Sequence, residues 1–155
     1  MKVATIRKAT QADIDELVEI WYKASEIAHD FISKIYWHKN KEAMKTKFLP
    51  SSEVYVATIE STIIGFIALM NDYLAAIFVL PKFQRQGVGS TLIEHAKNIR
   101  NKLELSVYKK NDNSINFYKS KGFLFVSEAI DKNTGEIEII MKWHNNKAKT
   151  KIIYK

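Results

Sequence analysis

Two glycines stand one residue apart in PKFQRQGVGSTLIEHA, residues 81–96, between a proline and an apolar stripe with helical spacing. The stripe predicts an amphipathic helix, and Gly87 and Gly89 weaken its start by roughly 1 kcal/mol each relative to alanine. The free N–H groups and the positive dipole end of such a helix suit an anion, and a phosphate above all. An ordinary tight turn is the alternative interpretation of this stretch.

A second group of polar side chains follows at residues 111–118. Asn111, Ser114 and Tyr118 stand at positions i, i+3 and i+7, so one face of a helix presents all three. The four histidines, at positions 29, 38, 95 and 144, lack the spacing of metal ligands, and the chain contains no cysteine. We therefore expect no metal site, no disulfide and no thiol nucleophile.

The composition limits the classes of protein to consider. The chain has 155 residues, of which 46% are hydrophobic and 26% charged, which predicts one compact domain over residues 1–144. Its net charge of +7 favours a polyanionic partner: nucleic acid, an anionic membrane or a multiply phosphorylated cofactor. The basic segment 145–155 has the composition of a solvated tail.

The chain shows no sign of secretion or membrane insertion. Its first residues, MKVATIRKAT, lack the apolar core of a signal peptide. The longest strongly apolar run, IIGFIALM, is far below the roughly 18 residues that a membrane span needs. We expect a cytoplasmic protein that does not enter a membrane.

The elements that must position these residues follow the order βααβββαβαββ. Thr10 is the expected N-cap of the first helix, with Asp13 at the capping-box position, and Gly122 is the expected residue after the last helix. A second, more polar helix is predicted over 33–50. Apolar strands are predicted at 53–60, 62–70 and 73–80, then at 102–108, 123–130 and 136–143. The strands at 53–60 and 62–70 are expected to form an antiparallel hairpin. Helices are expected to cover both faces of the sheet.

Two signatures on these elements resemble a known family. IFVLPKFQRQGVGSTLIEHA joins the strand, the glycine loop and the helix, and NDNSINFYKSKGF follows at the expected spacing. In this order they resemble the GNAT superfamily of acetyl-CoA-dependent N-acetyltransferases, over residues 3 to 143. The segment IWYKASEIAHDFIS narrows the resemblance to small bacterial members of the YjaB type. The resemblance implies an α/β fold, with a mostly antiparallel mixed sheet between helices.

The resemblance also implies a coenzyme A site. The loop N–H groups would cradle the pyrophosphate, and the main chain of Phe78 and Val79 would pair with the pantetheine arm like a strand. The face formed by Asn111, Ser114 and Tyr118 would turn toward the coenzyme. The implied loop residues are Gln84, Arg85, Gln86, Gly87, Val88, Gly89 and Ser90.

Amide formation from a thioester requires a neutral amine, a polarised carbonyl and a proton for the leaving thiolate. The resemblance assigns the polarisation to a main-chain N–H near Val79 and the proton to Tyr118. A tyrosine pKa near 10 is close to that of an alkyl thiol, so this proton transfer is nearly balanced. A packing role is the alternative for Tyr118.

The general base is not apparent. Many relatives carry Glu or Asp on the fourth strand, where this sequence reads Leu-Ala-Ala-Ile at 74–77. Either the base lies elsewhere, or the amine arrives neutral because its pKa is low, or solvent takes its proton. His29, Asp30 and Glu26 are the candidates elsewhere, and His29 has an unperturbed pKa near neutrality. A capping role at the helix end is the alternative for His29. The residues expected to bind the acceptor are Trp21, His29, Phe31 and Tyr36, with Trp37 also expected near it.

The sequence leaves several functions open. The first is N-acetylation of a small-molecule amine or a protein amino group by acetyl-CoA. The second is an acetyl-CoA sensor without turnover, which the missing strand acid favours. A third is a toxin of this superfamily that acetylates aminoacyl-tRNA; no nucleic acid other than tRNA is expected to bind. A monomer and a homodimer are both compatible with the sequence.

Overall fold

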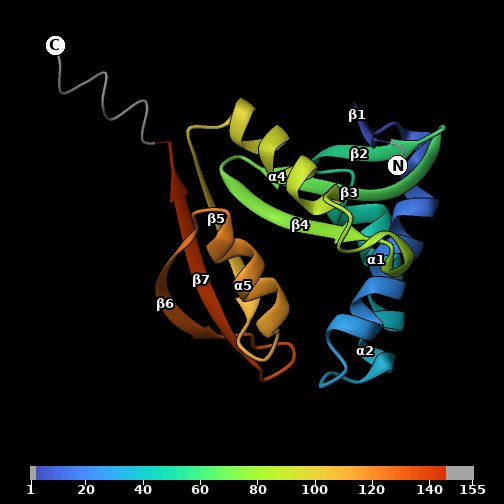
Figure 1. The fold of residues 1–155 in the computed structure, drawn as a ribbon. Coiled ribbons are helices and arrows are strands. Elements are labelled where there is room, and N and C mark those ends of the chain that lie inside the picture. Colours follow the sequence, from blue (N-terminus) through green and yellow to red (C-terminus); the bar gives the residue numbers. More distant parts are fainter. Residues whose placement is uncertain (1–2, 146–155) are drawn as a thin grey trace, which may run out of the picture.

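Seven strands form a single sheet in the computed structural model, which describes residues 3–145 (Figure 1). The strand order is β1-β2-β3-β4-β5-β7-β6, and all neighbours are antiparallel except β4 and β5. The mixed, mostly antiparallel sheet predicted from the sequence is confirmed. The tail predicted at 145–155 lies, beyond Asn145, outside the described residues. The strands are β1 (Thr5–Lys8), β2 (Glu53–Ile59), β3 (Thr62–Met70), β4 (Tyr73–Val79), β5 (Lys102–Tyr108), β6 (Leu124–Ile130) and β7 (Ile137–His144).

The long helices match their predicted positions, but the second predicted helix is wrong as a continuous element. The helices are α1 (Ile14–Ala28), α2 (Lys34–Lys39), α3 (Lys41–Ala43), α4 (Val88–Ile99) and α5 (Asp112–Ser120). Asn40 separates α2 from α3 with a ψ of 0°, and its side chain donates to the Tyr36 carbonyl at 2.7 Å. A π-helical turn over Met44–Phe48 then ends the segment. The backbone N–H of Asn40 donates to the same carbonyl at 3.2 Å, so the side chain adds a second bond at the residue whose backbone leaves helical geometry.

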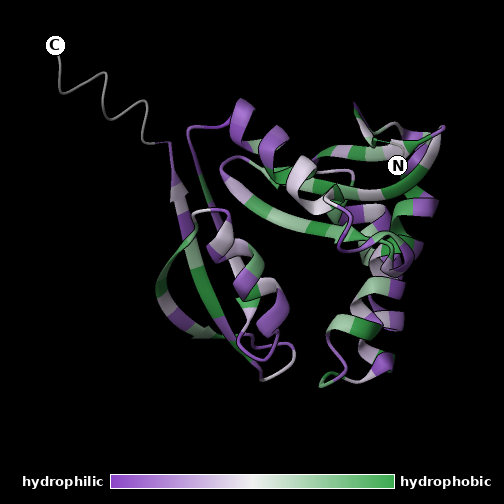
Figure 2. Ribbon diagram, in the orientation of Figure 1, coloured by the Kyte–Doolittle hydropathy of each residue, from purple (hydrophilic) through white to green (hydrophobic). Residues whose placement is uncertain are grey.

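Two hydrophobic cores lie on opposite faces of the sheet. Along β3, Ile64 and Ile67 pack with α4 and α5, whereas Phe66 and Ala68 pack with α1 and α2. Figure 2 shows hydrophobic residues concentrated along the central strands. Both faces of β3 are therefore covered, as its uninterrupted apolar sequence predicted.

Local end signals explain where two helices begin and end. Thr10 and Asp13 form a capping box on the 3₁₀ turn Gln11–Asp13, which leads directly into α1, and the Thr10 backbone N–H donates to the Asp13 carboxylate at 2.7 Å. Gly122 follows α5 with a φ of 89°, a left-handed conformation that glycine adopts without strain. Both predicted end signals are confirmed.

The sheet divides between β4 and β5, which diverge in Figure 1. Among residues 3–145, these strands pair only at Tyr73 and Glu104. The register of β3 with β4 passes from Ala68–Ala76 to Leu69–Leu74, which leaves Ala75 as the extra residue of a β-bulge. A bulge bends its strand and increases the local twist, so β4 turns away from β5.

Candidate active site

A cleft of about 310 Å³ lies where β4 and β5 diverge. Strand β4 forms one wall, β5 and α5 form the other, and α1, α2 and Met44 contribute side chains as well. Of the residues predicted for the site, the cleft wall contains Trp21, His29, Phe78, Val79, Gln84, Asn111, Ser114 and Tyr118. The topology thus brings together residues from five separate parts of the sequence.

The backbone of β4 faces the cleft at Val79. The Leu80 N–H donates to the Ile64 carbonyl of β3 at 2.8 Å. Because the backbone N–H and C=O groups of successive residues alternate in direction along a strand, those of Phe78 point toward β3 and those of Val79 point away from it. The side-chain amide of Gln84 donates to the Val79 carbonyl at 3.0 Å. The Val79 N–H is therefore the donor on the open edge, and of the two predicted residues only Val79 presents its backbone there.

The glycine loop leads into the amino end of α4 as the sequence predicts. Gly87 is the N-cap residue with a φ of 84°, and Arg85 also has a positive φ, 62°. The first intrahelical N–H bond is that of Thr91 to the Gly87 carbonyl at 3.0 Å. The N–H groups of Val88, Gly89 and Ser90 therefore have no acceptor within the helix, which is the arrangement that binds anions.

Gly89 has a different structural role from Gly87. A Cβ at Gly89 would lie 3.2 Å from Cζ of Phe117 in α5, whereas a Cβ at Gly87 would meet nothing within 4 Å. Gly89 therefore permits close packing of α4 on α5, and Gly87 permits the left-handed turn. Arg85 and Gln86 are exposed beside this turn, with the Gln86 amide donating to the Lys82 carbonyl at 3.2 Å.

Helix α5 directs its predicted polar face into the cleft. Asn111 is the N-cap, and its Oδ1 accepts from the Ser114 N–H at 3.2 Å. Tyr118 lies two turns further along the helix and is only 9% exposed, against Phe117 and Phe123. Burial raises the pKa of the Tyr118 hydroxyl well above its usual value, so the group remains protonated throughout the neutral range. The nearly balanced proton transfer expected from a pKa near 10 is therefore wrong, because the hydroxyl is a weaker acid than an alkyl thiol.

His29 ends α1 and is buried, at 8% exposure. Burial lowers its pKa from 6.5 to about 4, so the near-neutral pKa expected from the sequence is wrong. Its Nε2 lies 3.1 Å from the Asn111 amide nitrogen. Because that amide can only donate, Nε2 accepts and Nδ1 carries the proton. The basic nitrogen of His29 is thus already occupied, which argues against His29 as the base.

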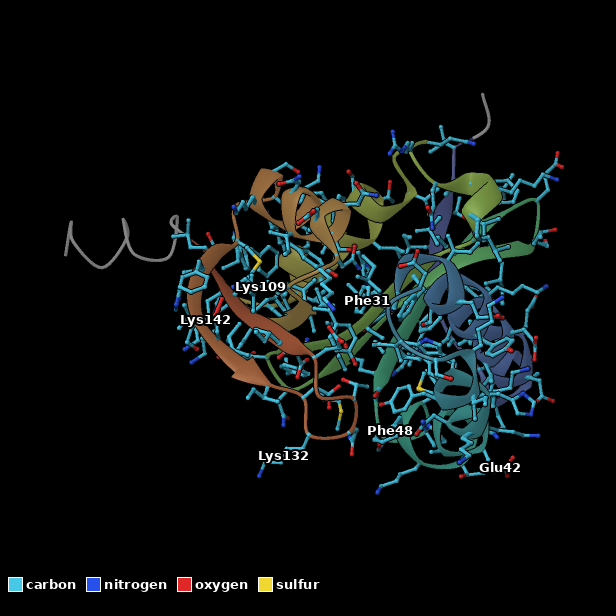
Figure 3. The ribbon with its side chains drawn as sticks, turned by 90° about the horizontal axis from the view of Figure 1, so that it is seen from below. Phe31, Glu42, Phe48, Lys109, Lys132 and Lys142 are labelled. Carbon is cyan, nitrogen blue, oxygen red and sulfur yellow. The ribbon has the colours of Figure 1, made fainter. Side chains whose placement is uncertain are left out.

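The predicted acceptor residues divide into two groups. Trp21 and His29 line the cleft, whereas Phe31 and Tyr36 do not. Phe31 packs edge-on against His29 and Tyr108, and Tyr36 packs against Trp37. Figure 3 shows Phe31 where the N-terminal helices approach the part of the molecule that carries β5–β7. Both residues therefore support side chains of the wall.

Tyr108 and Glu138 line the cleft although the sequence did not single them out, and Trp37, expected near the acceptor, lines it as well. Trp37 is buried, and its Nε1 has no hydrogen-bond partner in the described part of the chain. The Tyr108 hydroxyl donates to Asp131 at 2.6 Å. Strand register places Glu138 of β7 opposite Tyr108 of β5. Only that long-range pairing could have identified them.

Residues 3–145 offer neither a metal centre nor a membrane-spanning helix. These residues contain no group of three or more histidine, aspartate or glutamate side chains that could hold a metal ion. Within the same range, no helix has the length and apolar character needed to cross a membrane.

The chain is similar to known acetyltransferases. Residues 50–124 match the model of the acetyltransferase (GNAT) domain. The chain is 32% identical to the peptidyl-lysine N-acetyltransferase YiaC of Escherichia coli over 139 residues, covering 89% of this chain and 95% of YiaC. It is 33% identical to the peptidyl-lysine N-acetyltransferase YjaB of the same organism over 122 residues, covering 78% of this chain and 82% of YjaB.

Solved structures show the same fold. The solution structure of apo-form YjaB from Escherichia coli superimposes with a TM-score of 0.81 at 27% identity, covering 91% of this chain and 97% of that one. The PaiA N-acetyltransferase of Thermoplasma acidophilum, solved in complex with coenzyme A, superimposes with a TM-score of 0.77 at 23% identity. It covers 90% of this chain and 99% of the PaiA chain.

Proposed function

Because this chain belongs to the GNAT acetyltransferase family, we propose that it transfers an acetyl group from acetyl-CoA to the side-chain amine of protein lysines. YiaC and YjaB, both described as peptidyl-lysine N-acetyltransferases, support the choice of acceptor. The observation that carries the proposal is the convergence of the Val79 N–H and the Tyr118 side chain on one cleft, beside the amino end of α4.

The cleft has the features that a coenzyme A molecule requires. The Val79 N–H on the open edge of β4 is an unpaired donor for the amide-containing pantetheine arm. The N–H groups of Val88, Gly89 and Ser90 provide the anion site for the pyrophosphate, and Arg85 adds a positive charge beside it. Acetyl-CoA would supply the acetyl group as an activated thioester.

The side chains of the cleft provide the remaining chemistry. A main-chain N–H of β4 near Val79 polarises the thioester carbonyl, because a fixed donor stabilises the negative charge that develops on the oxygen. Tyr118 donates its proton to the sulfur that leaves. Asn111 fixes the start of α5, and with it the position of Tyr118 two turns later. The anchored His29 closes the cleft at the end of α1.

The test combines coenzyme binding with turnover. Calorimetry should show binding of coenzyme A without added metal, and thiol release should accompany acetylation of a lysine peptide. The exchange Gln86→Glu adds a carboxylate beside the anion site and should weaken coenzyme binding at least tenfold. Gln86→Ala, the neutral control, should retain most of the affinity.

The outcomes distinguish the competing functions. Equal coenzyme affinity in Gln86→Glu and Gln86→Ala would contradict the anion site at α4. Tight binding of acetyl-CoA without thiol release on any amine would favour the sensor. Acetylation of charged tRNA but not of lysine peptides would favour the toxin activity.

A further inference from the structure

Glu138 lies on the cleft wall opposite Tyr108. The two residues are direct partners in the antiparallel pairing of β5 with β7, so their side chains share one face of the sheet. Both residues line the cleft that also contains Tyr118 and Val79. Glu138 thus faces the same space as the proposed acid and the open edge of β4.

Among residues 3–145, Glu138 is the only acidic or basic residue, other than His29, that lines this cleft. The other titratable residues of the lining are His29, which burial keeps neutral, and the tyrosines Tyr73, Tyr108 and Tyr118. Within the described part of the chain, no lysine, arginine or aspartate lines it. In a protein with a net charge of +7, the cleft therefore has a single negative charge.

The carboxylate of Glu138 also differs from its neighbours on the same hairpin. Glu128 pairs with Lys109 at 2.7 Å, and Glu136 pairs with Lys110 at 3.2 Å. Glu138 forms no ion pair within residues 3–145, although it is half-buried. A partly desolvated carboxylate without a cation is costly, and a bound cation would offset that cost.

Aromatic rings line the same cleft as this carboxylate. Trp21 and Trp37 meet edge-on, with their ring centroids 5.7 Å apart, and both line the cleft together with Tyr108. Aromatic faces bind an aliphatic stem by apolar contact and attract a cation through their quadrupole. A lysine side chain, with four methylene groups and a terminal ammonium, matches these surroundings.

We infer that Glu138 binds the ammonium group of the acceptor and accepts its proton, supplying the base that the alanines of β4 cannot. This inference rests on the proposed acetyl transfer and deepens it. It assigns preference for a cationic amine to one carboxylate on β7. It also explains how acetyl transfer proceeds although β4 carries alanines at positions 75 and 76, where many relatives carry an acidic residue.

The protons balance through the full reaction. One ammonium proton passes to the Glu138 carboxylate, which leaves a neutral amine with a free electron pair. That pair forms the new C–N bond as the C–S bond breaks, and Tyr118 gives its proton to the sulfur. The nitrogen loses its second proton as the amide forms, and this proton restores Tyr118 through solvent. Glu138 then releases its proton to solvent.

The groups facing Glu138 favour this role. Asp131 of the β6–β7 turn is the nearby charged group. Tyr36 of α2 interacts electrostatically with both Asp131 and Glu138. Tyr108 of β5 lies opposite Glu138 in the strand pairing. Burial, aided by Asp131, raises the pKa of Glu138 above its usual value. A carboxylate with a raised pKa is a better proton acceptor.

The decisive variant is Glu138→Gln, which keeps the shape of the side chain and removes its charge. Two otherwise identical peptides serve as acceptors: one carries lysine, and the other carries an aminooxy group in place of the ε-amine, which is neutral near neutral pH. We expect kcat/KM for the lysine peptide to fall about 100-fold and that for the aminooxy peptide to fall less than about threefold. Glu128→Gln, outside the cleft, is the matched control and should behave like the wild type.

A binding measurement separates this inference from the proposed function. With coenzyme A present, the lysine peptide should bind Glu138→Gln about tenfold more weakly than the wild type, with unchanged coenzyme affinity. Equal losses on both peptides, or unchanged peptide affinity, would overturn the role of Glu138. A wild-type protein that acetylates neither peptide would instead overturn the proposed function, and the peptide affinities would still test Glu138.

Discussion

The amide nitrogen of Asn111 donates to Nε2 of His29 at 3.1 Å, joining residues that are 82 positions apart. His29 ends α1, and Asn111 begins α5, so this bond links the two parts of the molecule on either side of the cleft. It is buried and uses the only acceptor nitrogen of the ring. His29 is therefore better suited to holding the cleft together than to removing a proton.

Replacing His29 by glutamine should alter the pH dependence of stability. The histidine pKa falls from 6.5 in the unfolded chain to about 4 in the fold, so the folded state binds fewer protons, and stability declines as the pH falls through this range. The full shift corresponds to roughly 3 kcal/mol. In urea denaturation, the wild type should lose more stability than His29→Gln between neutral pH and pH 4.5.

The same variant tests the catalytic alternative. If His29 were the base, the acidic limb of the pH–rate profile would disappear in His29→Gln. We expect the wild type and His29→Gln to show the same acidic limb in their pH–rate profiles and similar kinetics per folded molecule. A limb that is lost only in the variant would restore His29 as the base.

Tyr118→Phe should lower kcat by about tenfold to a thousandfold, with little change in coenzyme affinity, because it removes only the proton donor. Tyr73→Phe, which removes another hydroxyl from the cleft lining, is the control and should retain most of its turnover. Steady-state kinetics and calorimetry on both variants provide the comparison. Unchanged turnover in Tyr118→Phe would mean that water protonates the sulfur.

Gly87→Ala should destabilise the protein by about 1–2 kcal/mol, because a φ of 84° strains any residue with a Cβ. Asparagine tolerates this conformation better than alanine, so Gly87→Asn should lose less stability. Thermal or urea unfolding of the two variants provides the test. Equal losses would show that the turn itself rearranges.

Arg100 connects the end of α4 to the sheet and should be important for stability. Its Nε donates to the Asn71 carbonyl at 2.8 Å, and its guanidinium pairs with Glu53 at 3.1 Å. Arg100→Met should cost about 1 kcal/mol, since it removes the ion pair and the bond to Asn71 while the Glu53 carboxylate keeps the hydrogen bond from the Tyr55 hydroxyl. Lys45→Met, which removes the exposed pair with Asp15, should have no measurable effect in the same denaturation experiment.

Features specified by neighbouring residues were predictable from the sequence. The Thr10–Asp13 capping box, the left-handed Gly122 and the glycine loop before α4 each depend on a few adjacent positions. The break at Asn40 was missed because the 33–50 segment has a continuous polar pattern, whereas the break lies in the backbone angles of one residue, a φ of −91° and a ψ of 0°.

Features that depend on distant pairing were not predictable. Glu138 reaches the cleft through the register of β7 with β5, which no local pattern encodes. The pKa of His29 depends on burial beneath residues from several elements, including Trp37 and Tyr108. The single-residue pairing of β4 with β5 likewise results from the bulge at Ala75.

That pairing at Tyr73 and Glu104 has a consequence for amide hydrogen exchange. Beyond this point, the amides of β4 that face the cleft, including Val79, have no strand to protect them, while those that face β3 are paired. Exchange along β4 should therefore alternate between fast and slow residues. A ligand that takes the place of the missing strand would slow the fast set, and its concentration would raise the melting temperature by mass action. The sheet of this protein would then reach its full stability only when its own substrate forms part of it.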